Sequence, residues 1–253
     1  MGKAEAVDAY VLHHVSDGQH WSVLGLDLHL PPFISLHGLM VLIGAGLVYL
    51  LFARIYRRDE AVPRGVTNLL ESMVLFVRDQ IVYANLGEEN GRRMAPLLLT
   101  QFFFILTLNL MGMLPVFVTA TGNINVTAAL ALVTLGTMIG GGIQANGAVG
   151  FFRGFLPHGV PTPVLPLLFL VEFLGIFIKA FALCIRLFAN MLAGHIVIFS
   201  LIGLVVSFGL IALPAVAAAV AIGLLELFVA FLQAYIFTML SSIFIGMTLH
   251  PEH

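Results

Sequence analysis

Five long apolar runs divide the chain, and short polar or charged segments separate them. A helix needs about 20 apolar residues to cross a lipid bilayer, and every run reaches that length. The pattern therefore predicts membrane-spanning helices. The five runs cover residues 34–53, 95–118, 126–145, 164–208 and 215–249.

The last two runs are longer than a perpendicular crossing requires. A helix of roughly 45 residues extends roughly 67 Å, whereas the hydrocarbon core of a bilayer is only about 30 Å thick. Residues 171–195 contain no turn signal, and the break between the two runs holds Gly209 and Pro214. We predict a hairpin of two long, steeply tilted helices.

Residues 54–93 interrupt the apolar pattern with a charged segment that holds seven of the chain's eleven Lys and Arg residues. Between Val66 and Ile81, apolar residues recur at helical spacing, which is typical of an amphipathic helix at a membrane surface. We therefore expect a cytoplasmic loop that contains an amphipathic helix. The seven cations are Arg54, Arg57, Arg58, Arg64, Arg78, Arg92 and Arg93.

Composition indicates the same class of protein. Of 253 residues, 60% are hydrophobic and 9% are charged, against about 25% charged in soluble proteins. The expected fold is an all-α integral membrane protein: an N-terminal transmembrane helix, an amphipathic surface helix, two transmembrane helices and the tilted hairpin. No basic tract suggests a nucleic-acid partner, and the net charge of −2 says nothing on this point, so no nucleic-acid partner is expected. The single Cys184 excludes a disulfide framework and is expected to be a small buried residue.

Charge asymmetry predicts the orientation of the chain. The Arg-rich segment 54–93 is expected on the cytoplasmic side, which places the tail of residues 1–33 outside and the C-terminus inside. The tail has no secretory signal and no transit peptide, so we expect a bacterial plasma (inner) membrane. Its four histidines match no metal-ligand spacing and are expected to be solvated. They are His13, His14, His20 and His29.

A polar stripe runs along the first arm of the hairpin. Its four residues are separated by 7, 7 and 4 positions and fall within about 80° of one another on a helix. His195 lies roughly on the opposite face. In the second arm, Glu226 and Gln233 are seven residues apart on one face. The stripe consists of Glu172, Lys179, Arg186 and Asn190.

Folding the hairpin sets these residues at two depths. The midpoint of Arg186 and Gln233 and the midpoint of His195 and Glu226 both fall at the break between the two runs. Antiparallel packing therefore places Arg186 level with Gln233, and His195 level with Glu226. The spacing predicts depth and leaves contact open.

The residue types of the two layers suggest an ion path with an electrostatic barrier. A central Arg costs about 2.5–3.5 kcal/mol to insert into a membrane, and it stays protonated, so Arg186 is a fixed charge. His and Glu can both exchange protons near neutral pH when buried. The other interpretation is that salt bridges between these groups hold the hairpin together, as Glu172 and Lys179 could do. Arg186 has no acid within four residues along its own helix.

Two segments of the hairpin resemble subunit a of rotary F-type ATP synthases. They are RLFANMLAGH at 186–195 and ELFVAFLQAYIFTMLSSIF at 226–244. The motif NLMGMLP at 109–115 and the short loop with NVT at 125–127 extend the resemblance over most of the chain. The His in the first arm and the acid in the second resemble the mitochondrial type of this family.

The resemblance implies a role for each polar residue of the hairpin. Arg186 matches the stator arginine, Asn190 and Gln233 match its polar neighbours near the rotor, and His195 and Glu226 match the outer half-channel pair. Protons would pass from this pair to a carboxylate on a rotating ring.

The resemblance also implies the partners of the chain. These are the ring of c subunits, the b subunits of the peripheral stalk, the rest of the F1F0 complex and the lipid bilayer. The subunit would move ions without being catalytic alone and without a cofactor. Glu172, nearer the cytoplasmic end of the helix, is the candidate for the inner half-channel.

Two other classes of protein remain to be weighed. A secondary transporter could bind an anionic substrate at an Arg near the midplane of the membrane. Such folds usually contain internal repeats, and the two halves of this sequence show no convincing repeat. An intramembrane enzyme would need motifs such as HExxH or GxSxG, which the sequence lacks. Ser241 and Ser242 have no nearby base and are expected to serve in helix contacts.

Overall fold

The structure is a computed structural model of the chain. It describes residues 20–23, 26–29, 35–55, 65–114, 117–155, 163–208 and 213–249. Nearly all of these residues are helical. The helices are α2 (Leu36–Leu50), η1 (Leu51–Ile55), α3 (Val66–Phe76), η2 (Val77–Tyr83), α4 (Ala84–Gly112), η3 (Ala120–Gly122), α5 (Ile124–Arg153), α6 (Leu165–Phe208) and α7 (Leu213–Leu249).

Five helical segments of the described chain are long and apolar enough to cross a membrane, which confirms the predicted class of all-α integral membrane protein. One short β-hairpin precedes them in the N-terminal tail, where β1 (His20–Val23) pairs antiparallel with β2 (Leu26–His29). The tail residues His13 and His14 lie outside the described residues. The five segments are Leu36–Arg54, Val66–Gly112, Ile124–Arg153, Leu165–Val205 and Pro214–Leu249.

The described residues form two compact units, and the long helices contribute to both. The first unit draws its residues from Met1–Tyr56, Phe103–Thr127 and Arg186–Tyr235. The second draws them from Arg57–Phe102, Ala128–Ile185 and Ile236–His253.

In the first unit, α2 packs against the C-terminal end of α4. The Ser35 hydroxyl caps α2 by accepting a hydrogen bond of 3.1 Å from the Gly38 amide, which satisfies one amide at the helix start. Gly44 lets α4 approach closely, because a Cβ there would lie 2.5 Å from a Leu108 methyl group. The buried core of this contact consists of Leu36, Met40, Leu108, Met111, Val118 and Ala120.

Helix α4 ends earlier than the predicted second span, residues 95–118. Its last helical residue is Gly112, and Met113 and Leu114 already lie outside the helix. Pro115 explains the early end, because proline lacks an amide hydrogen and disfavours helical backbone in the residue before it. Near its start α4 also bends at Gly87, whose φ of 72° favours glycine.

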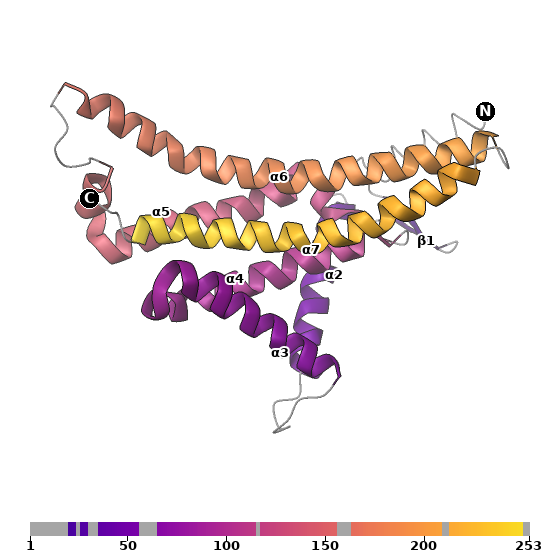
Figure 1. Cartoon of the computed structure of the whole chain (residues 1–253), viewed down its shortest axis with the longest axis horizontal. Helices are drawn as coiled ribbons and strands as arrows, with labels where there is room; N and C mark the ends of the chain where they lie inside the picture. The colour runs from indigo at the N-terminus through magenta and orange to yellow at the C-terminus, as the bar shows by residue number, and fades with distance from the viewer. Residues whose placement is uncertain are drawn as a thin grey trace. The chain divides into compact units, whose positions relative to one another are not determined.

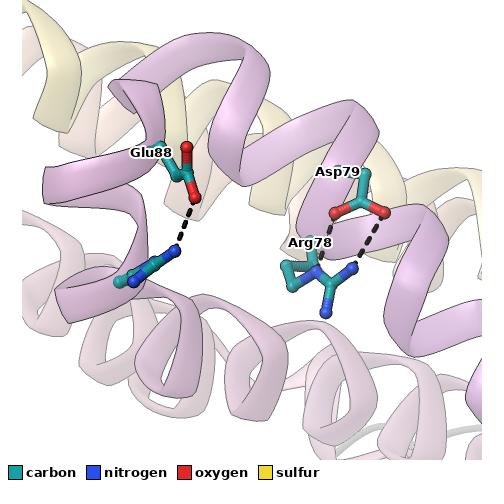
Figure 2. A network of polar contacts seen from close by, with 4 residues as sticks. Arg78, Asp79 and Glu88 are labelled. Carbon is teal, nitrogen blue, oxygen red and sulfur yellow. Dashed lines mark hydrogen bonds and ion pairs between the residues drawn. The ribbon is translucent and has the colours of Figure 1, made fainter.

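The charged part of the segment predicted as a cytoplasmic loop, residues 54–93, carries exposed ion pairs in the second unit. Arg78 donates two hydrogen bonds to the neighbouring Asp79, of 2.7 and 3.1 Å (Figure 2). Arg92 donates one of 2.6 Å to Glu88, one helical turn before it. Exposed pairs of this kind contribute about 0–1 kcal/mol to stability, so they mark a solvated surface and do not hold the fold together.

Helices α6 and α7 are long and continuous, as the absence of a turn signal predicted. They contain 44 and 37 residues, and Figure 1 draws each as one unbroken ribbon. In the second unit, α7 is held by buried hydrogen bonds. Ser241 lies 3.1 Å from the Thr134 hydroxyl of α5, and Ser242 donates to the Ile81 carbonyl at 3.2 Å. The two serines therefore make the helix contacts that were expected of them.

Candidate functional site

The two arms of the hairpin bring His195 and Glu226 into contact in the first unit. His195 Nδ1 on α6 lies 2.9 Å from Glu226 Oε1 on α7, and the side chains are only 11% and 6% exposed. Gly194 makes room for this approach, because a Cβ there would lie 2.7 Å from Glu226 Oε1. The two residues predicted at one depth are therefore direct neighbours.

Among the described residues, the hydrogen-bond partners of the His195 ring come from the main chain and from one threonine. Nδ1 lies 2.9 Å from the Met191 carbonyl, and Nε2 lies 2.8 Å from the Gly112 carbonyl and 2.7 Å from Thr119 Oγ1. A carbonyl oxygen only accepts hydrogen bonds. Both ring nitrogens thus face acceptors, an arrangement that suits a doubly protonated imidazolium beside the Glu226 carboxylate.

Sequence reasoning did not find Thr119 and Gly112 as parts of this site. Thr119 lies in the turn after α4, is buried, and places its hydroxyl 3.4 Å from the Gly112 carbonyl. Gly112 permits this packing, because a Cβ there would lie 3.0 Å from Thr119 Cγ2. The available signal was the pair of threonines in the short turn TATG, which looked like an ordinary polar loop.

A second polar pair lies nearer Arg186. Asn190 on α6 donates a hydrogen bond to Gln233 Oε1 on α7. Gln233 is buried and Asn190 is exposed. Gln233 was predicted to lie level with Arg186, and its observed partner is the residue one helical turn further along.

The Arg186 guanidinium has an unusual environment. Its side chain is half-buried, and Nη1 is buried without a hydrogen-bond partner among the described residues. Within the same part of the chain, no ion pair involves Arg186. The interpretation that mutual salt bridges hold the hairpin together therefore does not account for this cation.

Another buried amide, Asn109, lies in α4. It donates a hydrogen bond of 3.3 Å to the Ala230 carbonyl of α7, and its Oδ1 has no partner among the residues that the structure describes. A buried amide inside a membrane protein is costly unless it is paired, so Asn109 is a further polar residue of this region that sequence reasoning missed.

Glu172 and Lys179 belong to the second unit and do not pair there. Glu172 is exposed, and Lys179 Nζ lies 5.7 Å from the centre of the Phe244 ring and 3.8 Å from Met247 Sδ. The possible ion pair between Glu172 and Lys179 is not formed. The lysine instead uses a cation–π contact.

In the part of the chain that the structure describes, no group of three or more His, Cys, Asp or Glu side chains is arranged to bind a metal ion. Cys184 is buried, as expected of a small apolar residue. The side chains that the site does contain, His195 and Glu226, can exchange protons and pair charges.

This fold and this site define a multi-pass helical membrane protein with an ionisable pair buried inside a long helical hairpin. The chain belongs to the ATP synthase A chain family, whose model matches residues 38–246. The family resemblance inferred from the hairpin motifs is thus confirmed.

Relatives named ATP synthase subunit a match most of the chain. The chain is 43% identical to that of Anaeromyxobacter dehalogenans (strain 2CP-C), over 97% of this chain and 71% of the relative. It is 52% identical to that of Myxococcus xanthus (strain DK1622), over 78% of this chain and 65% of the relative. It is 44% identical to the subunit of Chloroherpeton thalassium (strain ATCC 35110 / GB-78), over 98% of this chain and 79% of the relative.

Proposed function

We propose that this chain is subunit a of the F0 sector of a rotary ATP synthase. It would translocate ions without being catalytic alone, and couple their passage to rotation of a ring of c subunits. Family membership and the names of the relatives support this proposal. The observation that carries it is the buried His195–Glu226 pair, which joins the two arms of the hairpin.

In this proposal, His195 and Glu226 form the outer half-channel. Protons reach the pair from outside and pass on to a carboxylate of the ring. The ion-pair distance of 2.9 Å supports this role, because direct proton exchange needs the two heavy atoms within about 2.6–3.2 Å of each other. A carboxylate beside an imidazolium also forms a pair that is neutral overall, which lowers the cost of burying it in a membrane.

Arg186 is proposed to be the electrostatic barrier between the two half-channels. A guanidinium without a partner is expensive inside a membrane, so an acid from another subunit is expected to pair with it. The buried Nη1 without a partner in the described chain supports this assignment. Arg186 would hold each deprotonated ring carboxylate in turn, and its fixed charge would stop protons from leaking past the stator.

The remaining assignments follow the same proposal. Asn190, which is exposed, and its partner Gln233 would lie near the rotor, and Glu172, also exposed, would line the inner half-channel. Residues 34–253 would form a single membrane domain with the tail of residues 1–33 outside and the C-terminus in the cytoplasm of a bacterium. Partners would be the c-ring, the b subunits and the rest of the F1F0 complex.

Vesicles that contain the assembled complex test the proposal. Arg186→Ala should abolish ATP synthesis driven by a proton gradient and raise passive proton permeability, and Arg186→Lys should also fail, because an ammonium lacks the planar guanidinium fork. Arg153→Ala, at the exposed end of α5, is the matched control and should behave like the wild type. Synthesis at the wild-type rate with Arg186→Ala would refute the barrier role.

Purification separates this function from the alternative of a secondary transporter that binds an anionic substrate at Arg186. A stator subunit should copurify with an oligomeric ring and a soluble ATPase. A chain that purifies without either, and that transports an anionic substrate in liposomes, would contradict the proposal.

A further inference from the structure

Thr119 places a hydroxyl group, which can rotate about its Cβ–Oγ bond, in contact with the buried imidazole of His195. Thr119 Oγ1 lies 2.7 Å from His195 Nε2 and 3.4 Å from the Gly112 carbonyl, and the Thr119 side chain is buried. We infer that Thr119 is a positioning residue for proton exchange at His195, serving both protonation states of the imidazole by rotating its hydroxyl. This inference rests on the proposed function.

The hydrogen-bonding capacity of the three groups leads to this role. When Nε2 carries its proton, it donates to the Gly112 carbonyl at 2.8 Å and to Thr119 Oγ1, while the Thr119 hydroxyl donates to the same carbonyl. When Nε2 loses its proton, its lone pair faces the lone pairs of that carbonyl. Of the two groups that contact Nε2, only a hydroxyl can both accept and donate a hydrogen bond.

The deprotonated state is therefore stabilised by a rotation about the Cβ–Oγ bond of Thr119. The hydroxyl turns away from the Gly112 carbonyl and donates to Nε2. Thr119 keeps its own proton throughout, and the proton that leaves His195 passes on along the path. Without the hydroxyl, the neutral imidazole would keep a buried, unpaired nitrogen next to a carbonyl oxygen, which is unfavourable.

No other described group in contact with His195 could donate a hydrogen bond to Nε2 when this nitrogen is deprotonated. The charged group in contact with the ring is Glu226 of α7, which lies at Nδ1, and the Met191 carbonyl of α6 also lies at Nδ1. The contacts of Nε2 come from the end of α4 and the following turn, and both are neutral. Nε2 is thus the ring nitrogen whose proton exchange depends on the hydroxyl.

Thr119→Val tests the inference, because valine has nearly the same shape and lacks the hydroxyl. The readout is ATP-driven proton pumping into inverted membrane vesicles with the assembled complex, measured between about pH 6 and pH 9 around the ordinary range of histidine. We expect a loss of about tenfold on the acidic side, because the unmade hydrogen bond destabilises the neutral imidazole and this form is scarcest there. Pumping on the alkaline side, where the neutral imidazole prevails in both proteins, should change little.

Two further variants isolate the hydroxyl. Thr119→Ser keeps it and should restore the wild-type pH profile. Thr100→Val makes the same chemical change on the exposed face of α4 and should have no effect. If Thr119→Val fails to assemble, Gly112→Ala provides a second test, because its Cβ would lie 3.2 Å from Thr119 Oγ1 and displace the hydroxyl. That variant should show a smaller loss, also confined to acidic pH.

The inference is overturned if Thr119→Val pumps with the wild-type pH profile, or if Thr119→Val and Thr119→Ser lose the same fraction of the rate at every pH. Such a uniform loss would indicate a packing role only. Failure of the proposed function looks different: the wild-type vesicles would not pump at all, or Arg186→Ala would pump normally.

Discussion

The close approach of Glu226 to the backbone of α6 makes Gly194 a sensitive position. An ideal Cβ at Gly194 would lie 2.7 Å from Glu226 Oε1 and 3.1 Å from its Cδ, both shorter than ordinary contacts between such atoms. In Gly194→Ala the carboxylate must therefore move, and its 2.9 Å contact with His195 must lengthen or break. The added methyl group is small, so the helix itself should be retained.

The size of the effect follows from the contact that is lost. The contact joins two ionisable groups, and an interaction with a charged group is worth about 1.5–3 kcal/mol; a loss of about 1.4 kcal/mol, close to the lower value, lowers the rate about tenfold. The carboxylate is the far end of a flexible side chain and can turn aside, which places the expected loss at the lower end of this range. The assay is ATP-driven proton pumping by vesicles with equal amounts of the assembled complex.

Two further variants distinguish displacement of the Glu226 carboxylate from a general loss of helix packing. Gly223→Ala on α7 adds the same methyl group where the structure has open space, and should pump normally. Gly194→Ala combined with Glu226→Asp shortens the acid by one methylene group and should recover part of the rate. Wild-type pumping by Gly194→Ala would refute the reasoning, and so would a double variant that is no better than Gly194→Ala alone.

Three other predictions concern both units. Exchanging His195 and Glu226 together should pump better than either single exchange, because the contact is kept; a double variant no better than the worse single one would contradict the pairing. Gly246→Val should lower the thermal stability of the complex by several degrees, as a Cβ there would lie 2.9 Å from a backbone oxygen of α4, which cannot turn aside. A double-mutant cycle of Gln101→Leu and Thr134→Val, followed by unfolding in detergent, should give a coupling of about 0.6 kcal/mol for their 3.0 Å hydrogen bond; a coupling of zero would mean that the bond contributes nothing.

Part of the site could be read from the sequence because helical geometry links spacing to depth. Residues 165–208 form one helix, and the arms meet near residue 210, so His195 and Glu226 had to lie at a similar depth. Arg186 could be singled out in the same way, because a guanidinium in an apolar run is expensive and no acid lies one turn away. These inferences need only the rise of a helix and the cost of burying charge.

Contacts that depend on rotation of the helices about their own axes could not be read in this way. The spacing predicted the depth of Gln233 and left its partner open, and the structure shows that it accepts a hydrogen bond from Asn190. Lys179, seven residues after Glu172 on the same face, lies over the Phe244 ring. A seven-residue spacing leaves two side chains about 10 Å apart along a helix, and the neighbouring helix then offers the nearer partner.

The sequence by itself determined the class of protein, the number of long apolar helices and the residues that are too costly to bury without a purpose. These follow from composition and period, which are local properties of the chain. Only the tertiary structure decided that Thr119 and the Gly112 carbonyl meet His195, and that Gly194 makes room for Glu226. Every residue has a main-chain carbonyl and glycine has no side chain, so neither contributes to the pattern of polar and apolar positions. Their role is therefore decided only when the helices pack against one another.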